Sequence, residues 1–194
     1  MIISILIAYM LGSIPFGKII TKLLTGEDIT KTGSKNIGAT NVYRTVSKKA
    51  GLLVLLLDGI KPIIAQVIIY YFFAQFYQNY KFLYFLTSII GHIFPIWLMF
   101  KGGKGVACFF GGYLIITPIP TLIAMAVWLL TVKITKTSSL GALISIFLLT
   151  IYQIVSNYGS LNKITIFTIM LLIFWKHTEN IKRLIQGKEN KINL

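Results

Sequence analysis

Long apolar stretches separated by short polar segments dominate this chain of 194 residues. Several are long enough to cross the hydrocarbon core of a bilayer, which takes roughly 20 apolar residues in a helix. Hydrophobic residues make up 56% of the chain and charged residues only 12%, with a mean hydropathy of +0.78. Soluble domains carry roughly 25% charged residues. The sequence therefore predicts an all-α, polytopic membrane protein that forms a single domain over residues 1–194.

Five apolar runs predict one span each, at about residues 1–20, 50–76, 82–100, 139–156 and 164–175. The first lacks a basic n-region and a cleavage pattern, so we expect it to remain as a span. Residues 106–132 are too long for one comfortable span, and Thr117-Pro118-Ile119-Pro120 interrupts them. Because proline breaks a helix interior, two short helices are the better interpretation, and whether both cross fully stays open. The intervening segments, among them residues 75–81 and 157–163, are expected to be turns, except residues 24–49, which should form a structured loop or short helices.

The basic residues indicate an orientation. If residues 106–132 return to the side where they start, all but three of the 19 basic side chains fall on one face. The exceptions are Lys81, Lys163 and Lys61, the last within a span. Because lysine and arginine concentrate on the cytoplasmic side, this asymmetry predicts seven membrane helices with the N-terminus out and the C-terminus in, in the cell (inner) membrane. The net charge of +14 suits anionic head groups and phosphorylated substrates, and the apolar spans argue against nucleic acid as a partner.

Two lysines alternate with three glycines in the hexapeptide Phe100-Lys101-Gly102-Gly103-Lys104-Gly105, between two long apolar runs. Glycine permits positive φ and removes the Cβ that would keep a ligand away, so consecutive N–H groups can converge on an anion while lysine adds charge. The pattern predicts a phosphate cradle at a membrane surface. The alternative is a pair of lysines that extend to the interface beside a flexible turn.

Two further polar segments fall on the same predicted face. Residues 33–44 offer hydroxyl, amide and guanidinium groups suited to phosphate oxygens, namely Ser34, Asn36, Thr40, Asn41 and Arg44. In the tail, His177 and Asn180 share a helical face with Ile181 and Leu184, which predicts that both polar residues point towards protein. The opposite face is charged and is expected to meet water or lipid head groups: Glu179, Lys182, Arg183 and Gln186. The alternative is that His177 and Asn180 only cap the last span.

Asp58, Lys61 and His92 lie well inside predicted spans. Asp58 and Lys61 stand three residues apart on one helical face, where charges are costly unless they are paired or functional. The spacing favours an internal ion pair over a substrate role. We expect His92, beside Phe94 and Pro95, to be a hydrogen-bonded core histidine.

Several other kinds of site lack required parts. Lys104 is followed by glycine, so the turn is not a P-loop, and no GxSxG motif occurs. The residue five after His92 or His177 is not aspartate, unlike the better known glycerolipid acyltransferases. The few acids are scattered and there is no HExxH motif or cysteine cluster, so neither a metal nor a cofactor is expected.

Four segments together resemble a known family. They are Gly12-Ser13-Ile14-Pro15, residues 33–41 with Arg44, Gly91-His92-Ile93-Phe94-Pro95 continuing into residues 100–106, and residues 177–184. In order and spacing they resemble the bacterial acyl-phosphate:glycerol-3-phosphate acyltransferases, and the resemblance covers essentially the whole chain. One departure is Lys35, where many members have a small or neutral residue.

The resemblance implies transfer of a fatty acyl group from acyl phosphate to the 1-hydroxyl of glycerol 3-phosphate. The products would be lysophosphatidate and phosphate, and the reaction would be the first step of membrane phospholipid synthesis. The implied active-site residues are Ser34, Arg44, Lys104, His177 and Asn180, with Gly102, Gly103 and Gly105 shaping the phosphate loop. The expected partners are glycerol 3-phosphate, acyl phosphate, membrane lipids and the enzyme that produces acyl phosphate. The active site is expected on the cytoplasmic face.

A transporter for a phosphorylated or anionic metabolite is the alternative function. Asp58 and Lys61 within a span keep it open, because transporters place charged residues near the midplane. Transporters also show repeated halves, however, and this chain has no sustained repeat. Most of its informative polar residues lie on one predicted face, which favours surface chemistry over translocation.

Overall fold

A computed structural model describes residues 1–156 and 158–192, and within them it contains helices and no strands. The chain divides into two compact units, residues 1–112 and 113–194. The first unit holds α1 (Ile2–Gly12), α2 (Phe16–Thr25), the 3₁₀ turn η1 (Ile29–Lys31), α3 (Ala39–Thr45), α4 (Lys48–Phe72), α5 (Ala74–Ile93) and η2 (Ile96–Leu98). Helix α6 (Val106–Ile116) runs across the division, and the second unit continues with α7 (Pro118–Thr135), α8 (Ser138–Val155), α9 (Ser160–Lys176) and α10 (Thr178–Ile185).

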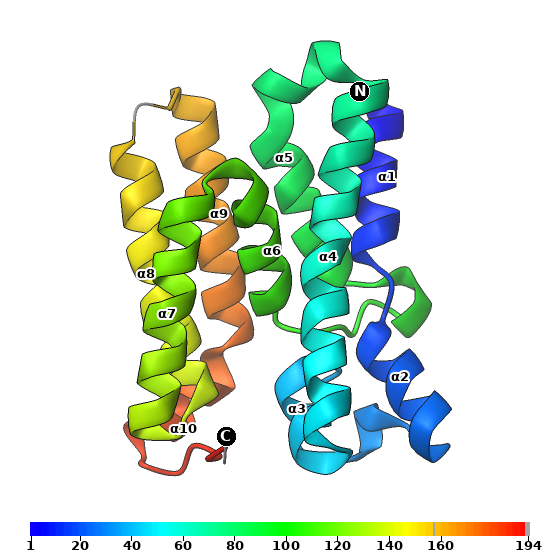
Figure 1. Ribbon diagram of the computed structural model, residues 1–194, viewed down its shortest axis with the longest axis vertical. Coiled ribbons are helices and arrows are strands. Elements are labelled where there is room, and N and C mark those ends of the chain that lie inside the picture. Colours follow the sequence, from blue (N-terminus) through cyan, green and yellow to red (C-terminus); the bar gives the residue numbers. More distant parts are fainter. Residues whose placement is uncertain (157, 193–194) are drawn as a thin grey trace. The chain divides into compact units, whose positions relative to one another are not determined.

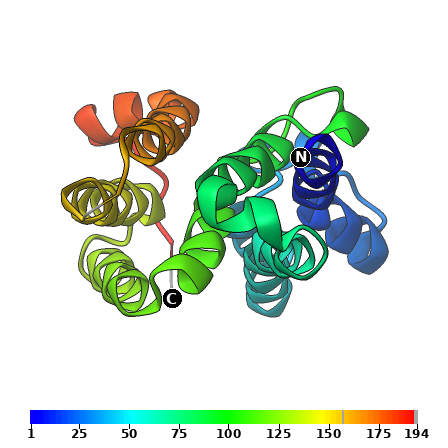
Figure 2. The same cartoon turned by 90° about the horizontal axis from the view of Figure 1, so that it is seen from above.

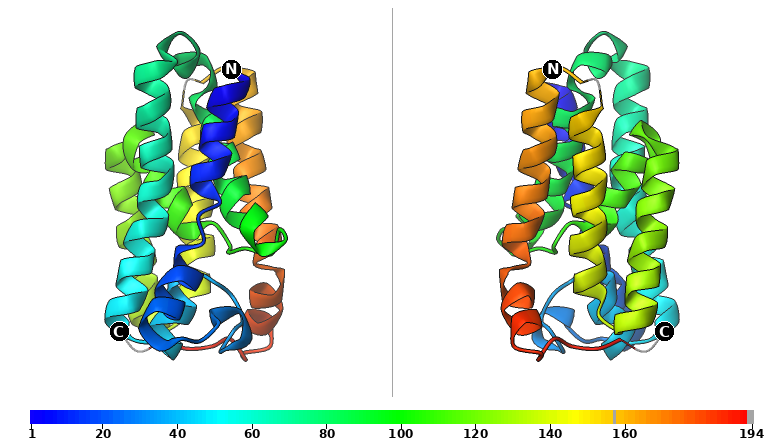
Figure 3. Two further views of the ribbon diagram at one scale, coloured as in Figure 1. Left: turned by 90° about the vertical axis from the view of Figure 1, so that its right-hand side faces the viewer. Right: turned by 90° about the vertical axis from the view of Figure 1, so that its left-hand side faces the viewer.

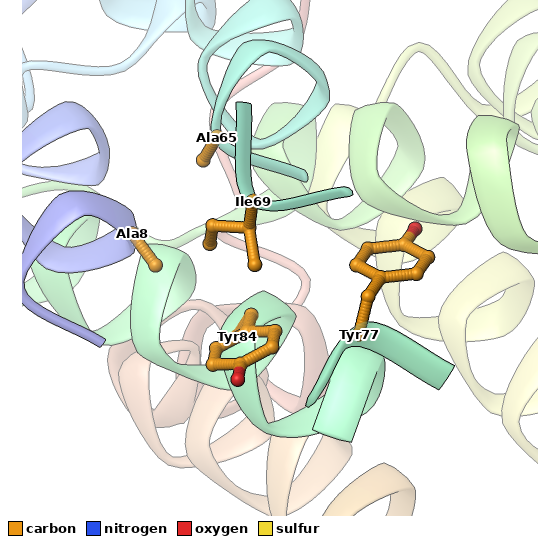
Figure 4. Close-up of a cluster of buried hydrophobic side chains, with 5 residues drawn as sticks. All are labelled: Ala8, Ala65, Ile69, Tyr77 and Tyr84. Atoms are coloured by element: carbon orange, nitrogen blue, oxygen red, sulfur yellow. The ribbon is translucent and has the colours of Figure 1, made fainter. Parts of the chain in front are cut away.

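Helices α1, α4 and α5 run side by side and form the framework of the first unit (Figures 1 and 2). Their shared core contains Ala8 of α1, Ala65 and Ile69 of α4, and Tyr77 and Tyr84 of α5 (Figure 4). Small residues bring α1 against α5, since a Cβ on Gly12 would lie only 2.2 Å from the carbonyl oxygen of Ser88. The first apolar run forms two helices and not one. They are separated at residues 13–15, because Pro15 has no N–H to continue the helical hydrogen bonds.

The expected turn at residues 75–81 is wrong, because α5 already begins at Ala74 and a single residue, Phe73, connects it to α4. The polar residues of this stretch lie on the exposed face of a helix, whereas Tyr77 points inwards and its hydroxyl donates to Gln66 Oε1 at 3.0 Å. The expected third span also ends early, at Ile93, and is followed by a loop that carries η2.

Short helices occupy residues 24–49, as expected. In Figure 3 (left), α2, η1 and α3 gather at the end of α4 where that helix begins. Asp28 caps η1 by accepting from Thr30 N at 3.0 Å and also pairs with Lys18 at 3.2 Å. These bonds, those from Thr30 first, lower the pKa of Asp28 to about 2. Ser47 caps α4 by accepting from Ala50 N at 3.1 Å.

In the second unit, α8 packs against both α7 and α9, and α10 follows α9 (Figures 1 and 2). The expected break of residues 106–132 is confirmed, because α6 ends at Ile116 and α7 begins at Pro118. The predicted 139–156 span corresponds to α8. The predicted turn at 157–163 is shorter, since α9 begins at Ser160, and Asn157 lies outside the described residues.

Five stretches of the described chain are long and apolar enough to cross a membrane: Ile2–Thr25, Lys48–Phe72, Ala74–Leu98, Pro118–Thr135 and Ser138–Val155. Helix α6 is apolar but shorter. Many large apolar side chains on these helices are exposed, among them Leu56 and Ile123, at 62% each. Such a surface suits lipid rather than water.

Candidate active site

The glycine–lysine turn, residues 99–105, is fastened to the end of α5 by its backbone. Gly102 N donates to Ile93 O at 3.0 Å, and Gly103 N donates to His92 O at 3.1 Å. We expected consecutive N–H groups of this turn to point at a phosphate. For Gly102 and Gly103 this expectation is wrong, because their N–H groups donate to carbonyl oxygens of α5. Glycine is still required here, since a Cβ on Gly102 would lie 2.2 Å from His92 O. Lys101 is exposed, and Lys104 is partly buried.

Asn41 organises the segment that carries Ser34. Its Oδ1 accepts from Ser34 N at 2.9 Å, and its Nδ2 donates to Asn36 O at 2.9 Å and to Thr32 O at 3.1 Å. Asn36 Oδ1 in turn accepts from Gly38 N at 2.8 Å, just before α3 begins. With only 3% of its surface exposed, Asn41 holds the loop from inside, while Ser34 lies on the exposed side.

Helix α3 presents Thr40 and Arg44, both partly buried, and packs against the beginning of α4. Beneath it lies a cluster of buried apolar residues that includes Ile37 and Val42, and Leu98 of η2 packs against this cluster. The structure thereby brings the segment of Ser34 and Arg44 together with the segment that leads into the glycine–lysine turn. One predicted segment and the residues that lead into another therefore share one small core.

In the second unit, His177 and Asn180 are buried, at 2% and 6% exposure, as the helical pattern predicted. His177 Nδ1 lies 2.8 Å from Ile173 O. A carbonyl oxygen only accepts, so this ring nitrogen carries the proton, and Nε2 is the nitrogen left for other contacts. Asn180 Nδ2 donates to Glu189 Oε1 at 2.6 Å.

Glu189 was not singled out from the sequence, although it links three parts of the second unit. Besides Asn180, Ser139 Oγ donates to its Oε1 at 2.9 Å and Arg183 Nε to its Oε2 at 2.8 Å. Arg183 was expected to face only water or head groups, but it pairs inwards with this carboxylate. The one available signal was that Glu189 is one of only two acids in a basic tail.

Known proteins resemble this chain over nearly its whole length. Residues 2–187 match the family described as glycerol-3-phosphate acyltransferase. The glycerol-3-phosphate acyltransferase of Pelagibacter ubique is 43% identical over 194 residues, which cover 100% of this chain and 98% of that protein. The protein of the same name from Ehrlichia chaffeensis is 39% identical over 196 residues, covering 99% of this chain and 96% of that one. The chain belongs to the glycerol-3-phosphate acyltransferase family.

Solved structures agree with this family assignment. Crystal structures of PlsY (YgiH), an integral membrane glycerol 3-phosphate acyltransferase, match with TM-scores of 0.89 for the glycerol 3-phosphate form and 0.86 for the lysophosphatidic acid form. The sequence identities are 34% and 33%, and each match covers 99% of this chain and 95% of the other. The expectation of an all-helical membrane protein of this family is confirmed.

The predicted site residues of this glycerol-3-phosphate acyltransferase family member are divided between the two units. Ser34, Arg44 and Lys104 belong to the first, and His177 and Asn180 belong to the second. The side chains of Asn36 and Asn41 form hydrogen bonds that shape the loop. Contact with phosphate stays a prediction for these two residues, and also for Thr40, Lys101 and the glycines at 102, 103 and 105. Among the described residues, no group of three or more His, Cys, Asp or Glu side chains could hold a metal ion.

Proposed function

We propose that this chain transfers a fatty acyl group from acyl phosphate to the 1-hydroxyl of glycerol 3-phosphate. Its membership of the glycerol-3-phosphate acyltransferase family carries this proposal. Its solved relative is known in forms with glycerol 3-phosphate and with lysophosphatidic acid, which are the acceptor and the product of such a reaction. The acyl phosphate donor is supported by the resemblance of the four sequence segments.

Positive charge is the main requirement of this chemistry. Two phosphorylated substrates must approach each other, and their repulsion has to be offset in a partly dehydrated site. Arg44 and Lys104, both partly buried in the first unit, suit this task. Ser34, Asn36, Thr40, Asn41 and Lys101 would add donors around the phosphates, and Gly102, Gly103 and Gly105 would shape the loop. His177 and Asn180 would complete the site.

The reaction balances without a protein nucleophile. The hydroxyl oxygen of the acceptor bonds to the acyl carbonyl carbon, the carbon–oxygen bond to phosphate breaks, and phosphate leaves with the electron pair. The phosphate of the acceptor, with a second pKa of about 6, takes the hydroxyl proton. His177 would then only bind and orient. Its contact with substrate would run through Nε2, because Nδ1 is bonded to Ile173 O.

The proposed arrangement in the membrane has seven helices, the N-terminus outside and the C-terminus inside. It is supported by five apolar stretches, by the shorter α6 and by the distribution of basic residues. The site would face the cytoplasm of the inner membrane, and the whole chain would act as one domain. Association with the enzyme that makes acyl phosphate would transfer this donor directly to the proposed site, before water could hydrolyse it.

The purified protein tests the donor and the acceptor together. With acyl phosphate and glycerol 3-phosphate we expect lysophosphatidate and free phosphate in equal amounts, and no product when an acyl thioester replaces acyl phosphate. Formation of lysophosphatidate from the acyl thioester, but not from acyl phosphate, would contradict the proposed donor.

The fate of the hydroxyl proton needs its own test. Glycerol without its phosphate should be essentially unreactive even at saturating concentration, and His177→Gln should retain more activity than His177→Ala. Efficient acylation of plain glycerol, or rescue of His177→Ala by added imidazole, would show that the protein supplies the base.

A further inference from the structure

A buried ionic cluster, Asp58–Lys61–His92, lies in the first unit next to the glycine–lysine turn. Lys61 Nζ is 2.9 Å from Asp58 Oδ1, and the two side chains are each only 2% exposed. Lys61 Nζ also donates to Ile14 O at 2.9 Å and lies 3.0 Å from His92 Nδ1. The internal ion pair expected from the sequence is confirmed, and His92 joins it.

The geometry assigns the proton on His92. An ammonium group has N–H donors and no acceptor, and Lys61 donates to Ile14 O, forms an ion pair with Asp58 and lies 3.0 Å from His92 Nδ1. Nδ1 of His92 therefore accepts, and in the neutral ring the proton sits on Nε2. The cluster fixes both the rotamer and the tautomer of this histidine.

His92 is also the residue on which the glycine–lysine turn rests. Its carbonyl oxygen accepts from Gly103 N, and a Cβ on Gly103 would lie 2.1 Å from its Nε2. The backbone of Gly103 thus packs directly on the ring edge that carries the proton. The side chain and the main chain of His92 both contact the turn.

The turn needs such support because its backbone is strained. Met99 and Phe100 have φ values of 49° and 62°, in the left-handed region that side chains rarely adopt. Strained residues persist only where their surroundings hold them in place. Here the bonds of Gly102 and Gly103 to the last residues of α5 provide that hold.

A proline couples α6 to the same cluster. Pro62 has no N–H, so the carbonyl of Asp58, four residues earlier, loses its usual helical donor. Cys108 Sγ lies 3.1 Å from this carbonyl and donates to it instead. The helix before the glycine–lysine turn, through His92, and the helix after it, through Cys108, therefore both contact the Asp58–Lys61 segment of α4.

We propose that Asp58, Lys61 and His92 are positioning residues that hold the glycine–lysine turn in the conformation that binds the phosphate of glycerol 3-phosphate. None of the three needs to touch substrate. They act through the ring and the carbonyl of His92 on Gly102 and Gly103, and through these on Lys104. The kinetic part of this inference rests on the proposed function.

Two substitutions at one position separate positioning from bulk stability. The amide oxygen of His92→Asn can replace Nδ1 as acceptor for Lys61, whereas His92→Leu cannot. We expect His92→Leu to raise KM for glycerol 3-phosphate at least tenfold with kcat and KM for the acyl donor changed less than threefold. His92→Asn keeps this acceptor but loses the ring edge under Gly103, so its KM should lie between the wild-type value and that of His92→Leu. Equal KM values for the two variants would overturn the proposal.

The ion pair offers a second, independent variant. Asp58→Leu combined with Lys61→Met removes both buried charges together, which proteins often tolerate without loss of stability. The combined variant should melt close to the wild type and yet show the raised KM. A wild-type KM in this variant would count against the proposal.

Gln66→Leu is the matched control. Gln66 is a fully buried polar residue of the same helix and bonds to Tyr77 and to Gly112 O, away from the turn. It should lower the melting temperature without raising KM.

Amide hydrogen exchange measures the stability of the glycine–lysine turn independently of enzyme activity. Amides of residues 99–105 should exchange at least tenfold faster in His92→Leu than in the wild type. In Gln66→Leu their exchange rates should equal those of the wild type. Unchanged exchange in His92→Leu would overturn the inference. Absence of turnover by the wild type would instead count against the proposed function, and the exchange experiment would still decide the inference.

Discussion

In the proposed site, loss of the positive charge at Lys104 or Arg44 would leave an anionic substrate with one fewer fixed counter-charge. A charge-assisted contact contributes roughly 1.5 to 3 kcal/mol, so Lys104→Ala and Arg44→Ala should each lower kcat/KM for glycerol 3-phosphate at least tenfold. Steady-state formation of lysophosphatidate measures this. Lys49→Ala, which removes an exposed lysine at the beginning of α4, serves as the control. Wild-type kinetics in both test variants would remove the phosphate-binding hypothesis.

Adding one carbon at Gly103 should weaken the binding of glycerol 3-phosphate more than it slows turnover. The new Cβ would lie 2.1 Å from Nε2 of a buried ring that cannot move away, so the turn itself must shift. We expect Gly103→Ala to raise KM for glycerol 3-phosphate several-fold. Gly159→Ala is the comparison, because a Cβ there meets nothing within 4 Å. Similar KM values for the two variants would contradict this reading of the turn.

At the scale of elements, α10 depends on an interaction that pH can remove. Burial alone would raise the pKa of Glu189, but hydrogen bonds from Asn180, Arg183 and Ser139 outweigh it and hold the pKa below its usual 4.5. A carboxylate with a lowered pKa in the folded state stabilises fully above about pH 4.5, and this stabilisation is lost as the pH falls through the folded pKa.

Glu189→Gln should therefore lower the melting temperature near neutral pH, and its difference from the wild type should shrink below pH 4.5. Thermal unfolding across this range measures both effects. Glu179→Gln is a suitable control, since Glu179 is exposed and pairs only with the exposed Lys182 among its described contacts. A difference from the wild type that is independent of pH would contradict the assigned role of the carboxylate.

Some elements could be read from the sequence and others could not, for physical reasons. Pro118 and Pro120 marked the boundary between α6 and α7 because proline cannot continue a helix. Polar residues at 75–81 gave no such marker, and whether they form a turn or an exposed helical face depends on the inward packing of Tyr77. The ion pair of Asp58 and Lys61 was local and predictable. Its links to Ile14 and His92 were not, since they join residues 47 and 31 positions away from Lys61.

The same distinction holds for the candidate site. Residue types suited to phosphate were visible at Ser34, Arg44 and Lys104. The shared core that places Leu98 under the segment containing Val42 was not visible, because it depends on tertiary packing. Glu189 was missed for a similar reason, since its partner Ser139 lies 50 residues earlier in the chain.

At the scale of the whole molecule, the proposed orientation predicts which residues each side of the membrane can reach. Lys35, Asn79 and Lys188 are all exposed, so cysteines introduced there should react. We expect Lys35→Cys and Lys188→Cys to be labelled only from the cytoplasmic side, and Asn79→Cys only from outside. Helix α4 has 25 residues and is therefore about 37 Å long, which is enough to place its first and last residues on opposite sides of the membrane.

The native Cys108 is buried and should contribute little background to this labelling. Impermeant thiol reagents applied to intact cells and to inverted vesicles make the comparison. Labelling of the positions at 35 and 188 from opposite sides would contradict both the common face and the seven-helix arrangement.

The contact between Gly103 and the ring of His92 also restricts how such a chain can evolve. A side chain at position 103 needs the space that the imidazole occupies, so the two positions cannot vary independently. Alanine fits at 103 without a shift of the turn only when a smaller residue has already replaced the histidine. An apolar residue at 92 in turn removes an acceptor from Lys61 and so alters the surroundings of its ion pair with Asp58. Divergence at this corner of the protein therefore has to proceed through several linked substitutions in a restricted order.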